Sequence, residues 1–138
     1  MLAFMSTSAS AQGKVTGQRA VQGAAHGEVK MEVSFQGTGH LLGVESMDMG
    51  TYVARIRQPG VLYGSGHGIS TTKDGESATW HGEGLGHATG KGMEAKWRGC
   101  LFMQTQSQKL ARLNAMAVIF EWDIDEHGGA KGTAWEWK

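Results

Sequence analysis

The stretch that decides the fold contains Gly64-Ser65-Gly66-His67-Gly68, the turn Lys73-Asp74-Gly75-Glu76, and Trp80-His81-Gly82-Glu83-Gly84-Leu85-Gly86-His87. An Asp-Gly pair between two alternating segments predicts a β-hairpin, because a tight two-residue turn needs positive φ. Centred on Asp74 and Gly75, that turn places Gly66 opposite Glu83 and His67 opposite Gly82. Glycine facing a larger residue lets a strongly coiled sheet close on itself. The stretch therefore predicts a β-barrel.

Most of the chain alternates apolar and polar residues with a period of two, which is typical of half-buried strands. The Gly37-Thr38-Gly39 run predicts a break between two strands, and Pro59-Gly60 predicts a turn. Eight short strands with tight turns predict an all-β protein, a single antiparallel up-and-down barrel. We expect the strands near residues 12–20, 29–36, 44–57, 61–72, 77–89, 93–106, 115–125 and 132–138.

The segment 107–114 departs from this alternation and predicts one short helix. Ser107 is suited to cap the helix, and the spacing of Leu110 and Leu113 places both on one side.

Three of the expected strands gather apolar and aromatic residues on one face. In the strand near 93–106 the shared face carries Met93, Ala95, Trp97, Leu101 and Met103. The last two strands form an aromatic hairpin, whose register is expected to gather Phe120, Trp122, Thr133, Trp135 and Trp137 on one face. The sequence does not say which face of any strand lines the lumen.

The length of 138 residues suits one domain. Thirteen basic residues balance thirteen acidic ones without a basic cluster, which argues against nucleic acid as a partner. No apolar run approaches the roughly 20 residues that span a bilayer, so we expect no membrane association. The lone Cys100 excludes an internal disulfide.

Residues 1–11 are expected to form a tail outside the barrel domain of residues 12–138. The run Ala9-Ser10-Ala11 matches an export cleavage site, but the apolar run before it is short and no basic segment precedes it. We therefore expect a cytoplasmic protein, with export as the alternative if residues 1–11 are a truncated signal.

The weak metal candidates are His81 and Glu83, which share one face of a strand. His87 lies about 20 Å from His81 along an extended strand, so these two cannot share one ion. His40 or His67 would have to complete such a site. Because Gly-x-Gly-x-Gly lies inside strands and not at a strand-to-helix turn, it implies no nucleotide, and we expect no cofactor.

The candidate catalytic residues are Glu83, His81 and Arg98, on the condition that their faces line the lumen. An ionisable group in a narrow lumen has a shifted pKa and can move a proton. If those faces point outward, the same residues form an ordinary solvated surface. The candidate ligand-binding residues are the aromatic side chains Tyr63, Trp80 and Trp97.

The region from Gly60 to Lys138 resembles a group of small uncharacterised microbial proteins, which in turn resemble the allene oxide cyclase-like β-barrels. The resemblance rests on Gly-x-Gly-x-Gly, the Thr72 to Glu76 turn, Trp80-x-Gly-x-Gly-x-Gly, Trp97-Arg98-Gly99, and Phe120-Glu121 with Trp135-Glu136-Trp137. It implies an eight-stranded, calycin-like barrel that associates into homo-oligomers. No cyclase catalytic residue matches a position in this chain.

Three functions remain open at this point. The first is a barrel that binds a small apolar or amphipathic ligand. The second is a cofactor-independent cyclase or isomerase acting in the lumen. The third is a structural assembly protein with a filled barrel.

Overall fold

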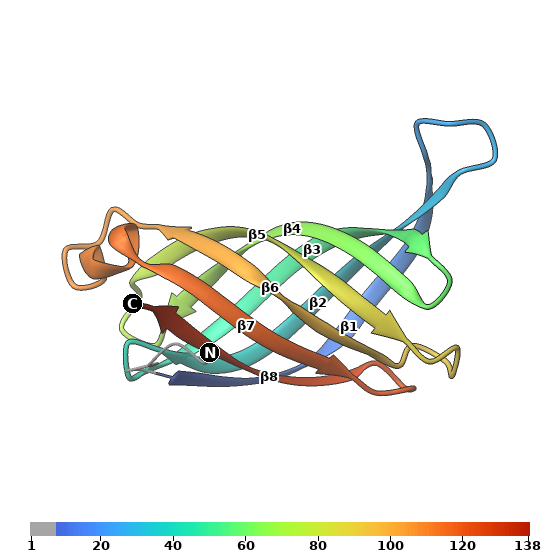
Figure 1. The fold of residues 1–138 in the computed structure, drawn as a ribbon. Helices are drawn as coiled ribbons and strands as arrows, with labels where there is room; N and C mark the ends of the chain where they lie inside the picture. The colour runs from blue at the N-terminus through green and yellow to red at the C-terminus, as the bar shows by residue number, and fades with distance from the viewer. Residues whose placement is uncertain (1–7) are drawn as a thin grey trace.

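Eight antiparallel strands form one closed barrel, in which each strand pairs with the next and β8 returns to pair with β1 (Figure 1). The computed structural model describes residues 8–138. The predicted all-β, up-and-down architecture is confirmed. The strands are β1 (Ser8–Gln22), β2 (Val29–Leu41), β3 (Val44–Gln58), β4 (Val61–Thr72), β5 (Ser77–Ala88), β6 (Ala95–Gln104), β7 (Ala117–Ile124) and β8 (Gly129–Trp137).

The first two strands are longer than expected. β1 begins at Ser8, so residues 8–11 pair with β8 instead of belonging to a tail, and residues 1–7 lie outside the described part of the chain. β2 continues through the predicted break at 37–39. The turn to β3 consists of Leu42 and Gly43, which both have positive φ. The β1–β2 hairpin projects beyond the end of the barrel (Figure 1).

The β4–β5 hairpin is shifted by one residue from the predicted register. Only Gly75 takes a positive φ in this turn (84°), and the Thr72 N–H donates to the Glu76 carbonyl oxygen at 2.8 Å. The turn is therefore one residue longer than the predicted two-residue turn. As a result Gly66 faces Gly82, and His67 faces His81. The predicted pairing of glycine with a larger residue across this ladder is wrong at these positions.

The β7–β8 hairpin is likewise one residue out of its expected register. Gly128 takes a positive φ (88°), and the Asp125 N–H donates to the Gly129 carbonyl oxygen at 2.8 Å. Side chains alternate with a period of two, so a shift of one residue in register exchanges the two faces of a strand. Phe120 therefore pairs with Ala134, Trp122 with Gly132, and Ile119 with Trp135. The prediction that Phe120 and Trp122 share a face with Thr133, Trp135 and Trp137 is wrong.

The inner face of the barrel is rich in glycine, and two tryptophan rings lie over these glycines. A Cβ atom at Gly50 would come within 2.5 Å of the Trp80 ring, and one at Gly86 within 2.8 Å of the Trp97 ring. Since Gly50 is on β3 and Trp80 on β5, small and large residues complement each other between strands two apart. Glycine is needed there because it leaves space for a large ring from a neighbouring strand.

The lumen is closed by two different hydrophobic clusters. At one end Trp97 is buried with Ala54, Ala95 and Ile124. At the other end Leu110 and Leu113, which belong to the connection between β6 and β7, pack against the barrel residues Leu41 and Ala78.

The β6–β7 connection contains the single short helical turn expected from the sequence. It is a 3-10 helix, η1 (Ala111–Ala115), shorter than the predicted 107–114 segment. The prediction that Leu110 and Leu113 lie on the same side is confirmed, because both are buried in one cluster. The Ser107 hydroxyl accepts a hydrogen bond from the Leu110 N–H at 3.4 Å. η1 lies at the same end of the barrel as the C-terminus (Figure 1).

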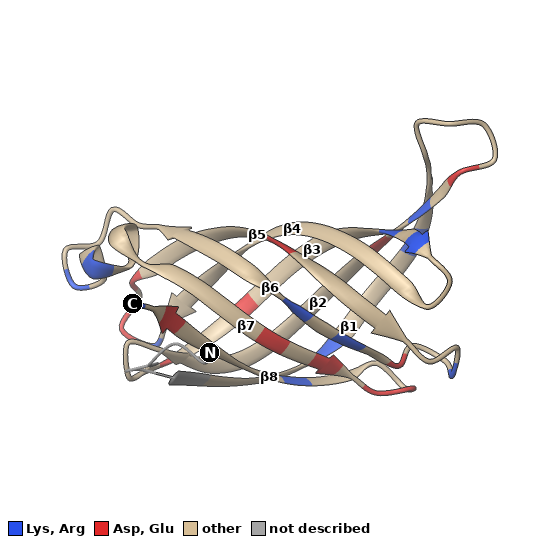
Figure 2. Ribbon diagram, in the orientation of Figure 1, with Lys and Arg blue, Asp and Glu red and all other residues tan. Residues whose placement is uncertain are grey.

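Acidic and basic residues are interspersed over the strands and turns (Figure 2). The ion pairs are mostly exposed, as between Arg98 and the carboxylates of Glu121 (3.6 Å) and Asp123 (2.8 Å). Within residues 8–138, no helix has the length and apolar character required to cross a bilayer.

Candidate functional site

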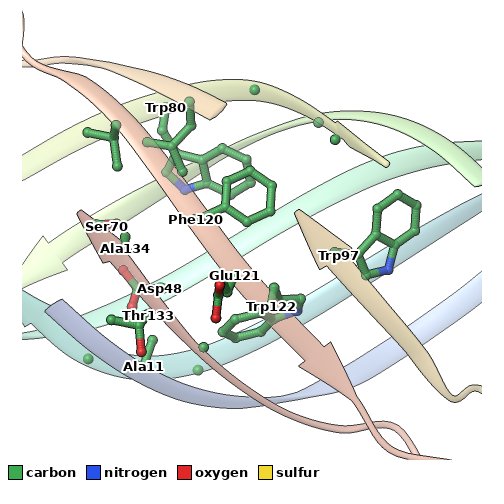
Figure 3. Close-up of a pocket in the computed structure, with 18 of the residues that line it drawn as sticks. Ala11, Asp48, Ser70, Trp80, Trp97, Phe120, Glu121, Trp122, Thr133 and Ala134 are labelled. Atoms are coloured by element: carbon green, nitrogen blue, oxygen red, sulfur yellow. The ribbon is translucent and has the colours of Figure 1, made fainter. Parts of the chain in front are cut away.

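A cavity of about 230 Å³ lies in the barrel lumen (Figure 3). All eight strands contribute to its wall, which is almost entirely apolar. A protein cavity of about 150 Å³ holds one benzene molecule. By the same ratio, this cavity suits a ligand of about nine non-hydrogen atoms.

Aromatic side chains from β2, β3, β5, β6 and β7 form a continuous layer in the cavity wall. The ring centroid of Phe35 lies 6.1 Å from that of Trp80 and 5.6 Å from that of Trp122. Tyr52 lies 6.3 Å from Phe35 and meets the Trp97 ring edge-on at 5.3 Å. These separations are within the range in which aromatic pairs attract each other. The layer is thus a firm apolar wall for a small ligand.

Asp48 contributes a carboxyl group to the same cavity. It lies on β3 directly opposite Gly37 of β2 and Ser70 of β4, and Ser46 is the preceding inward residue on its own strand. Burial raises the pKa of Asp48, and the hydroxyls of Ser70 and Ser46, within hydrogen-bonding reach, partly oppose that rise. Figure 3 shows Asp48 and Ser70 on one side of the cavity and Trp97 on the other.

Tyr52 and Trp97 place two further polar atoms among apolar surroundings. Burial raises the pKa of Tyr52 to about 12, and the nearby Trp97 indole opposes the rise. The Tyr52 hydroxyl and the Trp97 indole are close. However, no acceptor in the described part of the chain has the distance and angle of a hydrogen bond to Trp97 Nε1. Nε1 is therefore a buried donor without a hydrogen-bond partner in residues 8–138. Such a group costs about 1–3 kcal/mol if nothing satisfies it.

The three expected ligand-binding residues divide between the two faces of the barrel. Trp80 and Trp97 line the cavity. Tyr63 lies on the outer face, where its ring faces the Arg55 guanidinium at 5.1 Å. A hydrogen bond with Glu83 is the main cause that raises the pKa of Tyr63. Of the three expected ligand-binding residues, the structure thus brings Trp80 and Trp97 together in the cavity wall and leaves Tyr63 outside it.

The three candidate catalytic residues all have exposed side chains on the outside of the barrel. The His81 ring lies 5.9 Å from that of Phe102, an outer residue of β6. Glu83 is beside Tyr63, and Arg98 forms ion pairs with Glu121 and Asp123. The condition set for these candidates, a lumen-facing position, is therefore not met by their side chains.

The weak metal candidates His81 and Glu83 share that outer face. His67, considered above as a possible third ligand, lies directly opposite His81 across the β4–β5 ladder. Over residues 8–138, no group of three or more histidine, cysteine, aspartate or glutamate side chains is arranged to hold a metal ion.

Sequence reasoning missed the central residues of this site. In the sequence, Asp48 is one of thirteen acidic residues, and Phe35 is one apolar position in an alternating segment. The available signal was the alternation along β3, where Ser46, Asp48, Gly50, Tyr52 and Ala54 share one face. Several are small, but the pattern alone does not say that this face points inward.

The fold and the site together define a closed eight-stranded barrel with a small, aromatic-walled chamber. Solved structures of other proteins share this fold, including those of two proteins of unknown function. A protein with unknown function from Clostridium acetobutylicum ATCC 824 is 10% identical with a TM-score of 0.78, the match covering 94% of this chain and 96% of that one. A conserved protein of unknown function from Rhodopseudomonas palustris is 8% identical with a TM-score of 0.79, covering 99% of both chains.

At such low identity the likeness establishes the fold alone. No protein family matches the sequence, and no curated protein does either.

Proposed function

We propose that the barrel binds one small, largely apolar molecule in its lumen. The cavity carries this proposal, because protein interiors are close-packed and seldom leave voids larger than a water molecule. Here glycines line much of the wall, at positions where side chains would otherwise fill the space; they include Gly37, Gly39, Gly82, Gly84 and Gly132. Barrels of about eight strands either fill their lumen or hold one small ligand.

The unpaired N–H of Trp97 supports the same proposal. Buried donors in native proteins nearly always have a partner, so an orphaned one calls for an explanation. Trp97 is in the cavity wall, so a ligand oxygen or a water molecule held there is a suitable acceptor.

A cavity-filling variant tests the proposal. Ala134 faces the cavity on β8, whereas Ala117 of β7 is exposed on the outside. We expect 2-phenylethanol to bind the unmodified protein in the millimolar range or tighter by calorimetry. Ala134→Phe should abolish that binding, and the matched Ala117→Phe should retain it. Circular dichroism establishes that both variants are folded. Equal binding by the two variants would overturn lumenal binding, and so would a failure of the unmodified protein to bind this alcohol or either of its charged counterparts, phenethylamine and phenylacetate.

Native mass spectrometry of protein purified from its own host gives a second test. A lumenal binder should carry a retained mass of small-molecule size, which Ala134→Phe removes. The same measurement counts the subunits. The homo-oligomer expected from sequence stays a prediction until that is done.

The alternative of an allene oxide cyclase-like cyclase or isomerase would have to use Asp48 or Tyr52. Both occupy inward positions of β3, whereas His81 and Arg98 are absent from the cavity wall, and Glu83, although it borders the cavity, has an exposed side chain on the outer face. Chromatography of the retained molecule separates the two functions. An isomer that differs between the unmodified protein and Asp48→Asn indicates turnover, and an identical molecule indicates binding alone. The filled-barrel alternative requires a lumen without a ligand-sized cavity, which disagrees with the 230 Å³ chamber.

A further inference from the structure

Asp48 is a carboxyl group without a cationic partner. The inward positions around it are Ser46 on its own strand, Gly37 and Gly39 on β2 and Ser70 on β4, and none of them is ionisable. Lysine and arginine are missing from the cavity wall over residues 8–138, and His40, which does touch it, is exposed.

A second inward-facing carboxyl group, that of Glu136 on β8, is paired with cations. Glu136 lies opposite the buried Val118, and its side chain is only 13% exposed. It forms ion pairs with Arg112 of η1 and, at 3.9 Å, with Lys138. A buried carboxylate is costly unless it is paired. Asp48 thus lacks a counter-charge that the same fold supplies to Glu136.

Aromatic faces lie one inward position away from Asp48. Gly50 is the next inward residue on β3, about 7 Å further along the strand. Phe35 is its direct partner on β2, and the Trp80 ring also lies over Gly50. The Asp48 Oδ2 atom lies on the Gly39 side, where a Cβ would be 3.3 Å from it, so an apolar group that extends from Asp48 toward Gly50 would reach the rings of Phe35 and Trp80.

We propose that the lumenal ligand is an amine, bound as its ammonium form with the nitrogen at Asp48. This inference rests on the proposed lumenal binding and names its ligand class. The three ammonium hydrogens match three acceptors, the Asp48 carboxylate and the hydroxyls of Ser46 and Ser70. The apolar part of the ligand fills the space beside Trp80 and Phe35. A wall without a lysine or arginine side chain disfavours an anion.

Three probes of nearly equal size test the charge preference at pH 7. Phenethylamine is cationic there, 2-phenylethanol is its neutral counterpart, and phenylacetate is the anion. We expect calorimetry to show phenethylamine binding roughly tenfold or more tighter than 2-phenylethanol, because hydrogen bonds to charged groups are the stronger ones. Phenylacetate should bind most weakly.

Asp48→Asn removes the charge with little change of shape. It should weaken phenethylamine roughly tenfold and leave 2-phenylethanol within about threefold. The matched control is Glu45→Gln, which removes an exposed carboxylate near the start of β3 that pairs with Lys73. This control should leave all three affinities unchanged.

The binding measurements distinguish a failure of the amine preference from a failure of lumenal binding itself. If 2-phenylethanol binds and phenethylamine binds no more tightly, or if Asp48→Asn leaves phenethylamine affinity unchanged, the amine inference is overturned and lumenal binding stands. If no probe binds the unmodified protein, both are overturned.

Discussion

The two ends of the barrel lumen are closed in different ways. At one end Trp97, only 6% exposed, lies over Gly64 and Gly86, so its ring is set into the wall of the barrel itself. At the other end the buried Leu110 and Leu113 come from a connection that contains one short 3-10 helix. The first closure is built from strands that are hydrogen-bonded on both sides. The second is a separate segment that covers an opening.

This difference indicates which end can open. Moving Trp97 requires distortion of β6, which is held in ladders with β5 and β7. Moving Leu110 and Leu113 requires residues 105–116 to leave the end of the barrel. This movement breaks no strand ladder, because the segment lies between β6 and β7. Segments outside the ladders open at lower free energy than the sheet. We therefore expect ligands to reach the cavity past η1.

The largest effect should come from removing the tryptophan closure. Trp97→Ala leaves a void over two glycines that cannot fill it, and should lower the free energy of unfolding by about 3–5 kcal/mol. Urea denaturation followed by circular dichroism measures the loss. Trp137→Ala is the matched control, because Trp137 is 53% exposed and should cost well under half as much. Equal losses in the two variants would contradict the role given to Trp97.

A somewhat smaller effect is expected at the leucine closure. Leu113→Ala should cost about 2–3 kcal/mol, because a connection can partly collapse onto the gap. It should also speed the dissociation of phenethylamine severalfold, as measured by NMR relaxation dispersion. The matched variant at the tryptophan end is Ile124→Ala, which removes a buried aliphatic side chain from β7. A faster dissociation in Ile124→Ala alone would reverse the assignment of the opening end.

Asp48→Asn should stabilise the ligand-free barrel in a pH-dependent way. The folded-state pKa of Asp48 is raised, so its contribution to stability is full below the ordinary value of 3.8 and is lost as pH rises through the folded value. At pH 7 the ionised carboxylate is therefore a cost that the variant removes. We expect Tm to rise by about 2 °C at pH 7, with no difference at pH 3. A loss of Tm at pH 7 would show that the carboxylate is stabilised by a group other than a ligand.

The smallest effect on stability should come from Arg112→Gln. The Arg112 guanidinium binds Glu136 and so ties η1 to β8, but its side chain is about half exposed. Glu136 keeps Lys138 as a second cationic partner at 3.9 Å, and ion pairs with an exposed partner contribute little, so we expect a change of about 1 kcal/mol or less. Hydrogen exchange of residues 110–116 should nevertheless become faster. Unchanged exchange there would mean that Arg112 does not hold the closure.

Much of the architecture was predictable from local alternation. The face of β6 that carries Trp97, Leu101 and Met103 was recognised, and these residues lie in or beside the lumen. The position of Leu110 and Leu113 on one side of a short helical segment was also predicted correctly. These predictions succeeded because each depends on the spacing of residues within one element.

The errors occurred where two elements meet. The β4–β5 turn contains one more residue than predicted, and the β7–β8 register differs by one residue from the expected one, which exchanged the faces of Trp135 and Trp137 relative to Trp122. The same kind of shift paired His67 with His81. Ser46, Asp48, Gly50 and Tyr52 occupy successive inward positions on β3, and nothing in that strand alone shows that they share a cavity with Phe35 and Trp80.

The amino-acid sequence by itself determined the strands, their number and their two faces, because backbone geometry sends successive side chains to opposite sides. Closure of the sheet decided which of those faces became the interior. Alternation is symmetric between the faces, and only the ring of eight ladders, with tryptophans set over glycines from other strands, makes one of them concave. A cavity with an unpaired carboxyl group is therefore a property of the closed barrel and of no single strand.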